Sequence, residues 1–241
     1  MLVERGWAAS RERAQALVLA GKVLVNEQKL EKPGAAIDAA ASIRVLGEDL
    51  RYVSRGGAKL EKALEHWQIS VAGRVCMDIG ASTGGFTDCL LQHGAARVIA
   101  VDTGYGQIAM SLRQDSRVRL LERTNARYLK AEDVVEPVEF VAVDVSFISA
   151  TLVLPSVIQA AMSAGTRRLE LVVLVKPQFE VGRERVGKGG IVRDPDAQLD
   201  AVEKVRRAIL ALGARDTEFI ESPILGAEGN REFLLHAVVG S

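Results

Sequence analysis

Residues 75–86, Val-Cys-Met-Asp-Ile-Gly-Ala-Ser-Thr-Gly-Gly-Phe, place a short apolar run directly before a glycine-rich turn. Glycine adopts left-handed backbone conformations without steric cost, so its repeated use here allows a tight turn that a ligand can approach closely. An apolar strand that enters a glycine-rich turn is typical of sheets whose strands alternate with helices. This stretch therefore predicts the first strand of an α/β domain.

Further apolar runs of strand length follow at residues 98–101, 118–121, 140–145 and 169–175, with helical stretches between them. Such continuous runs are typical of parallel strands that are buried on both faces. The last two runs, at residues 218–220 and 233–239, are separated by only about a dozen residues, which favours a hairpin over a crossover helix. The predicted fold class is α/β, with a Rossmann-like, mostly parallel sheet that ends in an antiparallel C-terminal hairpin.

A small α+β unit is predicted before this sheet. A helix over residues 11–20 ends at Gly21, and short strands follow at residues 22–26 and 43–46, with a turn at Pro33-Gly34 between them. We expect this small module to span residues 1–47. A linker is expected at residues 48–58, and the larger domain at residues 59–241.

The composition limits the class of protein. Hydrophobic residues make up 48% of the 241, enough for a sizeable core, but no apolar run is as long as a membrane span. The two cysteines cannot form a disulfide framework and the N-terminus lacks a signal-peptide pattern, so we expect a cytoplasmic protein. The histidines, His66, His93 and His236, lack the spacing of metal ligands, so we expect no metal site.

The formal charge is zero, with 31 basic and 31 acidic residues. Nucleic-acid-binding proteins are usually more basic, so any RNA contact must come from clustered cations. One cluster is a glycine-rich segment at residues 182–193, which is either a substrate clamp or an ordinary solvated loop; its cations are Arg183, Arg185, Lys188 and Arg193. A second set in the small module could contact phosphates and comprises Arg11, Arg13 and Lys22.

The glycine-rich turn and two acids predict a cofactor site. Asp78 lies just before the turn, and Asp102 ends the next strand, where a carboxylate can accept the hydroxyls of an adenosine ribose. A dinucleotide site needs a glycine at the middle position of G-x-G-x-x-G, which Ser82 occupies here. S-adenosylmethionine has no pyrophosphate, and its ammonium group suits Asp78. The turn therefore favours S-adenosylmethionine over NAD, and a turn without any ligand is the remaining alternative.

The residues that follow the later strands help to distinguish an amino, a carbon and a hydroxyl acceptor for a methyl group. Residues 144–147, Asp-Val-Ser-Phe, lack the Pro-Pro-aromatic sequence that is usual in amino-methylating enzymes. Methylation of pyrimidine carbon 5 needs a thiolate, but Cys76 and Cys89 fall within a strand and a helix, where small core residues are expected. A hydroxyl acceptor needs a base. Lys176, at the tip of an apolar strand, is a candidate base if its surroundings favour the neutral amine, and a solvated lysine is the alternative.

Five blocks of sequence, in this order, resemble the TlyA family of FtsJ-like ribose 2′-O-methyltransferases. They are residues 54–60, 78–86, 144–147, 175–180 (Val-Lys-Pro-Gln-Phe-Glu) and 229–234 (Gly-Asn-Arg-Glu-Phe-Leu), and the resemblance covers nearly the whole chain. Residues 10–26 are similar to an S4 RNA-binding domain. The resemblance implies methyl transfer from S-adenosylmethionine to the ribose 2′-hydroxyl of cytidines in bacterial ribosomal RNA. The implied partner is ribosomal RNA or a ribosomal subunit, with the large subunit favoured and the small one possible.

The resemblance also assigns roles to individual residues. The family's catalytic tetrad corresponds to Lys59, Asp144, Lys176 and Glu232, with Lys176 as the expected base. The implied cofactor-binding residues are Asp78, Gly80, Ala81, Ser82, Gly84, Gly85, Phe86, Asp102 and Asn125. The RNA-binding residues that we expect are Arg11, Arg13, Lys22, Asn26, Arg55, Arg183, Lys188 and Arg193.

The chain departs from the family pattern at its N-terminus. S4 domains usually open with Arg-Leu-Asp and a full first helix, whereas this chain begins Met1-Leu2-Val3-Glu4, so we expect a module that is shortened at its start. Its C-terminus resembles that of members that act on the large subunit only. Two alternative functions are an RNA-binding protein without catalysis and, because members have been labelled haemolysins, a membrane-lytic protein. The complete tetrad weighs against the first, and the lack of an amphipathic or spanning segment weighs against the second.

Overall fold

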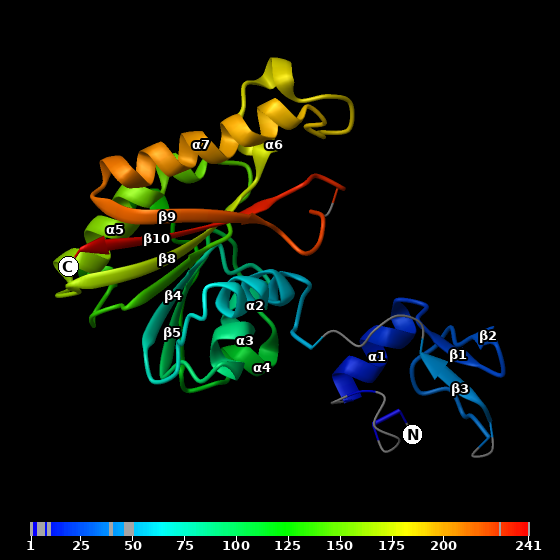
Figure 1. The fold of residues 1–241 in the computed structure, drawn as a ribbon. Helices are drawn as coiled ribbons and strands as arrows, with labels where there is room; N and C mark the ends of the chain where they lie inside the picture. Colours follow the sequence, from blue (N-terminus) through cyan, green and yellow to red (C-terminus); the bar gives the residue numbers. More distant parts are fainter. Residues whose placement is uncertain are drawn as a thin grey trace. The chain divides into compact units, whose positions relative to one another are not determined.

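The computed structural model describes residues 2–3, 8, 11–38, 41–45, 51–226 and 228–240, except for the side chains of residues 13 and 45. The chain divides into two compact units, residues 1–51 and 52–241 (Figure 1). This division places residues 52–58, which we expected to form a linker, in the second unit. The expected shortening of the N-terminal module concerns residues that lie mostly outside the described ones.

The first unit is a small antiparallel sheet with one helix. It contains α1 (Arg11–Leu19), β1 (Val23–Val25), β2 (Gln28–Lys29) and β3 (Ile43–Val45), and the strand order is β2-β1-β3. Leu17 and Val18 of α1 pack with Val23 and Ile43 in its core. The predicted helix and two strands are confirmed. Strand β2 was not predicted, because its two residues are both exposed and give no apolar signal.

The second unit is built on a seven-stranded mixed sheet with the order β6-β5-β4-β7-β8-β10-β9. Strands β4 to β8 pair in parallel, whereas β10 runs antiparallel to both β8 and β9. The predicted α/β class and the C-terminal hairpin are therefore confirmed. The strands are β4 (Val75–Ile79), β5 (Arg97–Val101), β6 (Val118–Leu121), β7 (Phe140–Val143), β8 (Arg168–Val175), β9 (Ala214–Glu221) and β10 (Phe233–Gly240).

Helices cover both faces of this sheet, as Figure 1 shows. One apolar cluster packs under α2, α3 and α4, and a second packs under α5 and α7. Alternate residues of β4 belong to opposite clusters, since Cys76 packs in the first and Met77 in the second. The helices are α2 (Gly56–His66), α3 (Gly85–Gln92), α4 (Met110–Arg113), α5 (Leu154–Ser163), α6 (Pro177–Glu180) and α7 (Pro195–Ala211). Short 3-10 turns are η1 (Ala126–Tyr128), η2 (Ala131–Asp133), η3 (Ala150–Leu152) and η4 (Arg183–Arg185).

Tyr52 explains why the second unit begins earlier than we expected. Its side chain is buried and belongs to the cluster under α2. A Cβ atom at Gly57, in the first turn of α2, would lie only 2.2 Å from the Tyr52 ring. This close packing fixes the segment before α2 against the helix. Among the described helices, none is both long and apolar enough to cross a membrane.

A charged cluster connects β8 and β10 at the end of the sheet opposite the glycine-rich turn. Glu170 of β8 accepts a hydrogen bond from Arg74 at 2.7 Å and lies 3.1 Å from the His236 ring of β10. The Trp67 ring stacks on His236, with 5.1 Å between the ring centroids. Hydrogen bonding to His236 and Arg74 lowers the pKa of the Glu170 carboxyl to about 2, although burial opposes the shift.

Glu170→Gln should lower the free energy of unfolding at pH 7 by about 2 kcal/mol. A carboxyl whose pKa is lower in the folded state stabilises the fold above its unfolded pKa. That contribution is lost as the pH falls through the folded value near 2. Urea unfolding of both proteins between pH 7 and pH 2.5 should therefore show a difference that shrinks below pH 5. Glu136→Gln, which removes an ion pair to the exposed Arg97, is the control. A difference for Glu170→Gln that does not change with pH would contradict this explanation.

Candidate active site

The glycine-rich turn between β4 and α3 brings the ends of two strands together. Gly80 has a φ of 88°, and a Cβ atom there would lie 2.3 Å from the carbonyl oxygen of Asp144, at the end of β7. Only glycine fits this position. Ser82 adopts a φ of 49° in the same turn, which is uncommon outside glycine and asparagine. The turn therefore lies directly against the segment that follows β7.

A cavity of about 510 Å³ opens at the carboxyl ends of the strands. Five residues that the sequence assigned to the site line it: Gly80, Ser82, Asp102 and Asn125 from the cofactor-binding set, and Asp144 from the catalytic set. The wall also includes Thr103, Gly104 and Gln107 from the loop after β5, and Phe147 and Ile148 from the segment after β7. Asn125 faces the cavity while its side-chain oxygen accepts a hydrogen bond from Arg127 N at 3.0 Å.

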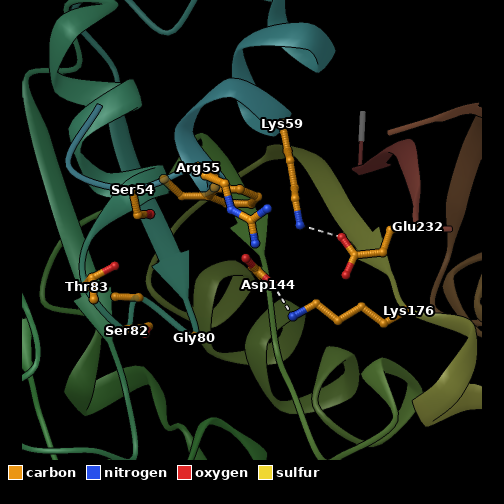
Figure 2. A pocket seen from close by; sticks show the side chains of 13 residues that line it. Ser54, Arg55, Lys59, Gly80, Ser82, Thr83, Asp144, Lys176 and Glu232 are labelled. Carbon is orange, nitrogen blue, oxygen red and sulfur yellow. Dashed lines mark hydrogen bonds and ion pairs between the residues drawn. The ribbon is translucent and has the colours of Figure 1, made fainter. Parts of the chain in front are cut away.

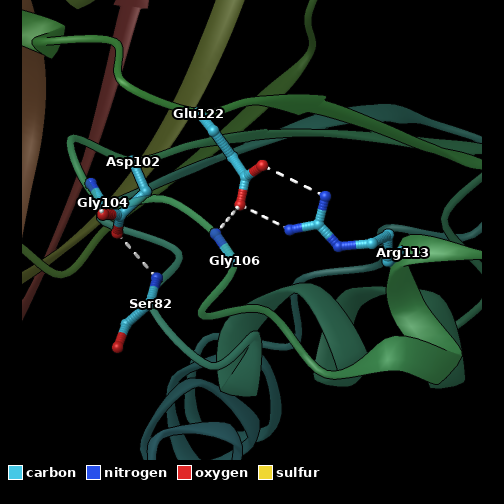
Figure 3. Close-up of polar contacts among 6 residues, drawn as sticks. All are labelled: Ser82, Asp102, Gly104, Gly106, Arg113 and Glu122. Carbon is cyan, nitrogen blue, oxygen red and sulfur yellow. Dashed lines mark hydrogen bonds and ion pairs between the residues drawn. The ribbon is translucent and has the colours of Figure 1, made fainter.

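Asp102 joins the glycine-rich turn to the loop after β5. One carboxylate oxygen accepts from the backbone N–H of Ser82 at 2.7 Å, and the other accepts from Gly104 N–H at 2.6 Å (Figure 3). Each oxygen has a second acceptor site left for a ligand hydroxyl. The carboxylate can thus shape the cavity wall and bind a diol at the same time.

A second acid, Glu122, anchors the same loop from the end of β6. Its carboxylate accepts from Gly106 N–H at 2.6 Å and pairs with the Arg113 guanidinium at 2.5 Å (Figure 3). The Arg113 hydrogen bonds are the largest influence on this carboxyl and lower its pKa. Glu122 was not predicted from the sequence, although it follows a strand directly, as Asp102 does. Its role depends on the conformation of the loop after β5, which the residue pattern does not reveal.

A second cavity, of about 250 Å³, adjoins the first and shares Gly80, Ser82 and Asp144 with it. The structure brings all members of the expected tetrad to this cavity, and they point toward one another in Figure 2. Its lining comprises Ser54, Arg55, Gly56, Lys59, Gly80, Ala81, Ser82, Thr83, Gly85, Phe86, Asp144, Lys176 and Glu232.

The tetrad is arranged as two lysine–carboxylate pairs. Lys59 Nζ of α2 donates to Glu232 Oε2, just before β10, at 2.5 Å, and both side chains are buried. Lys176 Nζ, directly after β8, lies 2.6 Å from Asp144 Oδ1 and donates to Ser146 Oγ at 2.7 Å. Each ammonium is therefore balanced by one carboxylate, and both pairs line the same cavity.

The structure does not place two expected cofactor residues at either cavity. Asp78 is fully buried, and its carboxyl accepts from Thr87 Oγ1 at 2.6 Å beneath the turn. Burial raises the pKa of this carboxyl to about 7, although the Thr87 hydrogen bond opposes the shift. Oδ2 of Asp78 thus faces Thr87 of α3, and the direct contact that we expected between Asp78 and a ligand ammonium stays a prediction. Gly84 instead caps α3 with a φ of 97°, and a Cβ atom there would lie 2.3 Å from Leu112 Cδ1.

The cations expected to bind RNA lie in both units. Arg55 lines the smaller cavity beside the tetrad, whereas Arg183, Lys188 and Arg193 are exposed on the segment that follows α6. In the first unit, Arg11 is exposed and Lys22 is half-buried, and the Arg13 side chain lies outside the described atoms. The Asn26 side chain accepts from Ser42 N–H at 3.0 Å, so it holds the β1–β2 turn in place.

Phe147 is a functional candidate for which the sequence predicted no role. Its side chain is 91% exposed at the rim of the larger cavity, and its φ is 65°. A left-handed backbone at an exposed aromatic residue is strained, and such strain is found mostly at functional sites. The ring lies 5.3 Å from that of Phe179, between centroids, and leaves a face open to solvent.

The described geometry suits group transfer between two ligands that bind side by side. The larger cavity offers an acid for a diol and a glycine-lined wall, and two lysines line the smaller cavity that adjoins it. No phosphate-binding glycine occupies the middle of the turn, where Ser82 stands. The site therefore fits a nucleoside cofactor without a pyrophosphate.

Comparisons with known proteins agree with this geometry. Residues 52–238 match the family of FtsJ-like methyltransferases. The chain is 50% identical to YqxC of Bacillus subtilis, over 98% of this chain and 83% of that protein. It is 47% identical to the 16S/23S rRNA (cytidine-2'-O)-methyltransferase TlyA of Mycobacterium tuberculosis, over 97% and 86% of the two chains. A solved structure from Streptococcus thermophilus, 43% identical, superposes with a TM-score of 0.75 over 100% of this chain and 86% of the other. The chain therefore belongs to the FtsJ-like methyltransferase family and, within it, to the group that includes TlyA.

Proposed function

We propose that this protein transfers a methyl group from S-adenosylmethionine to the ribose 2′-hydroxyl of a cytidine in bacterial ribosomal RNA, with the large subunit as the favoured target. The observation that carries the proposal is the convergence of Lys59, Asp144, Lys176 and Glu232 on one cavity that adjoins a nucleoside-sized one. The cytidine-2'-O-methyltransferase activity for which the TlyA relative is named supports the choice of acceptor.

The larger cavity fits the adenosine part of S-adenosylmethionine. Asp102 would accept the ribose hydroxyls, and Asn125 lies on the wall where an adenine would rest. The absence of a Cβ at Gly80, together with Ser82 at the junction of the two cavities, would leave room for the amino-acid end. When bound, S-adenosylmethionine supplies an electrophilic methyl group on a sulfonium sulfur.

Lys176 is the residue best placed to act as the base. The attacking 2′-hydroxyl must lose its proton, and a neutral amine at Lys176 Nζ can accept it. Asp144 and Ser146 hold this nitrogen at 2.6 Å and 2.7 Å, which fixes its direction. The buried Lys59–Glu232 pair forms the opposite wall and would position the acceptor ribose. Because the reaction is an in-line displacement, alignment of the two ligands supplies much of the rate enhancement.

Basic and polar groups of both units would bind the RNA. Arg183, Lys188 and Arg193 would contact phosphates, as would Arg11, Arg13, Lys22 and Asn26 from the S4-like first unit. The buried Asn230 ties the 182–193 segment down, since it accepts from Val192 N–H and donates to Gly190 O, each at 2.9 Å. The open face of Phe147 at the cavity rim suits stacking with an unpaired base.

The proposed activity can be tested directly on ribosomal subunits. Purified large and small subunits from a strain that lacks this protein are incubated with the enzyme and S-adenosylmethionine labelled on its methyl group. Nuclease digestion and mass spectrometry should then find 2′-O-methylcytidine in large-subunit RNA, and calorimetry should find no binding of NAD. Methylation of a base, or no transfer to either subunit, would refute the proposal.

Substitution of Lys176 tests its role as the base. Lys176→Ala should slow methyl transfer by roughly a hundredfold, the usual scale for loss of a general base, while S-adenosylmethionine binding changes little. Lys176→Arg should be nearly as inactive, because a guanidinium remains charged at any usable pH. Single-turnover rates and calorimetry measure the two effects, with Lys62→Ala on the exposed face of α2 as the control. Substantial activity in Lys176→Arg would show that the residue acts as a fixed charge instead.

Substitution of Glu122 tests how the cofactor loop is held. Glu122→Gln turns an amide NH₂ toward the Arg113 guanidinium and should raise the Kd for S-adenosylmethionine roughly fivefold, equivalent to one lost hydrogen bond of about 1 kcal/mol. The single-turnover rate at saturating cofactor should remain close to that of the wild type. Asp115→Asn removes a neighbouring exposed ion pair, to Arg117, and serves as the matched control. Equal affinities for all three proteins would mean that the loop does not depend on Glu122.

A further inference from the structure

Glu180 is a buried acid whose role the proposed reaction does not explain. It is the last residue of α6, four residues after Lys176 in the same sequence block, and its side chain is only 2% exposed. It lines neither cavity. A carboxylate that is withdrawn from water to this extent needs strong partners to offset its desolvation.

The partners of Glu180 lie on the segment that follows β7. Oε1 accepts from the backbone N–H of Ala150 at 2.7 Å, and Oε2 accepts from Ser149 Oγ at 2.5 Å. From the other side, the half-exposed Lys204 of α7 donates to the Glu180 carbonyl at 2.6 Å and lies 3.3 Å from Oε2. Glu180 thus connects the segment after β7 to the turn after β8.

These two connected segments carry half of the tetrad. Asp144 and Ser146 on the first segment contact Lys176 on the second. Phe147 contacts Phe179 a few residues further on. Phe147, whose φ of 65° is left-handed, lies in the sequence between Ser146, which contacts Lys176, and the residues that Glu180 binds. A strained backbone persists only when its surroundings fix it, and Glu180 supplies the fixed point on the C-terminal side of this residue.

We propose that Glu180 is a positioning residue that holds Ser146 and Phe147 in register with Lys176. It contacts no ligand and takes part in no proton transfer. Its two hydrogen bonds fix residues 149–150, and so determine where the 144–148 segment presents its side chains to the cavities. This inference rests on the proposed methyl-transfer function. It adds that the reaction depends on a carboxylate outside the tetrad.

The alternative explanation is that Glu180 only docks α7 through Lys204. Three variants of the full-length protein separate the two roles, assayed by single-turnover methyl transfer to ribosomal subunits and by calorimetry with S-adenosylmethionine. Glu180→Ala removes both hydrogen bonds to residues 149–150. Glu180→Gln keeps an oxygen for Ala150 N–H and an NH₂ that can donate to Ser149 Oγ. Lys204→Met removes only the α7 contact and is the matched control.

For Glu180→Ala we expect a loss of methyl-transfer rate of roughly thirtyfold or more, since small displacements of reacting groups cost about a hundredfold. Its Kd for S-adenosylmethionine should rise by no more than about fivefold, because neither Ser149 nor Ala150 lines the larger cavity and the loss of one hydrogen bond is worth about 1 kcal/mol. Glu180→Gln should recover most of the rate, and Lys204→Met should match the wild type. Combining Glu180→Ala with Phe147→Ala should cost much less than the sum of the two single losses, because both act through the same segment.

Three results would overturn the inference. They are full activity in Glu180→Ala, an equal loss in Lys204→Met, and additive losses in the combined variant. If Glu180→Ala fails to fold, Ser149→Ala takes its place, since it removes one of the two hydrogen bonds, and unchanged activity there would also count against the proposal. A wild-type protein that methylates neither subunit would refute the proposed function itself, which distinguishes that failure from failure of the Glu180 inference.

Discussion

The close approach of two backbones at Gly80 and Asp144 determines the geometry of the whole site. A Cβ atom at Gly80 would lie 2.3 Å from the Asp144 carbonyl oxygen, so any side chain there would push the ends of β4 and β7 apart. Because these strands are neighbours in the sheet, this contact brings the glycine-rich turn against the segment that begins with Asp144. The two cavities meet at these residues. A wider gap would separate the cofactor wall from the tetrad.

The strand order explains why the cofactor wall and the tetrad lie on either side of this contact. From β4 the chain first extends the sheet through β5 and β6, and it then crosses over to β7 and β8. Ligands of such sheets bind at this reversal, beyond the carboxyl ends of the strands. Asp102 and Glu122 follow the strands on one side, and Asp144 and Lys176 follow those on the other. Lys59 reaches the same point from α2, and Glu232 from the start of β10.

Apolar runs were sufficient to predict the strands in the interior of the sheet, because strands buried on both faces contain few polar residues. Strand β9 is mostly exposed, and only its residues 218–220 were predicted. The tetrad could be named because its members lie in separate sequence blocks whose order resembles a known family. The burial of Asp78 could not be predicted, since the spacing of a turn does not reveal to which face a side chain turns. Glu122 and Glu180 were missed for a related reason. Each acts by accepting hydrogen bonds from backbone that is distant in sequence, and no residue pattern marks those partners.

Charge balance within the site agrees with the ligands that the proposed reaction brings together. The cofactor carries a sulfonium cation, whereas the RNA brings phosphate anions into the adjoining space. While both lysines are protonated, the two lysine–carboxylate pairs give the tetrad no net charge, so it then repels neither ligand. A buried pair such as Lys59–Glu232 usually contributes little to folding, because desolvation offsets the attraction between the charges. Its presence on the wall of the smaller cavity is therefore better explained by the orientation of reacting groups than by stability. The phosphates would then be attracted by the exposed cations of the 182–193 segment, outside the neutral interior of the site.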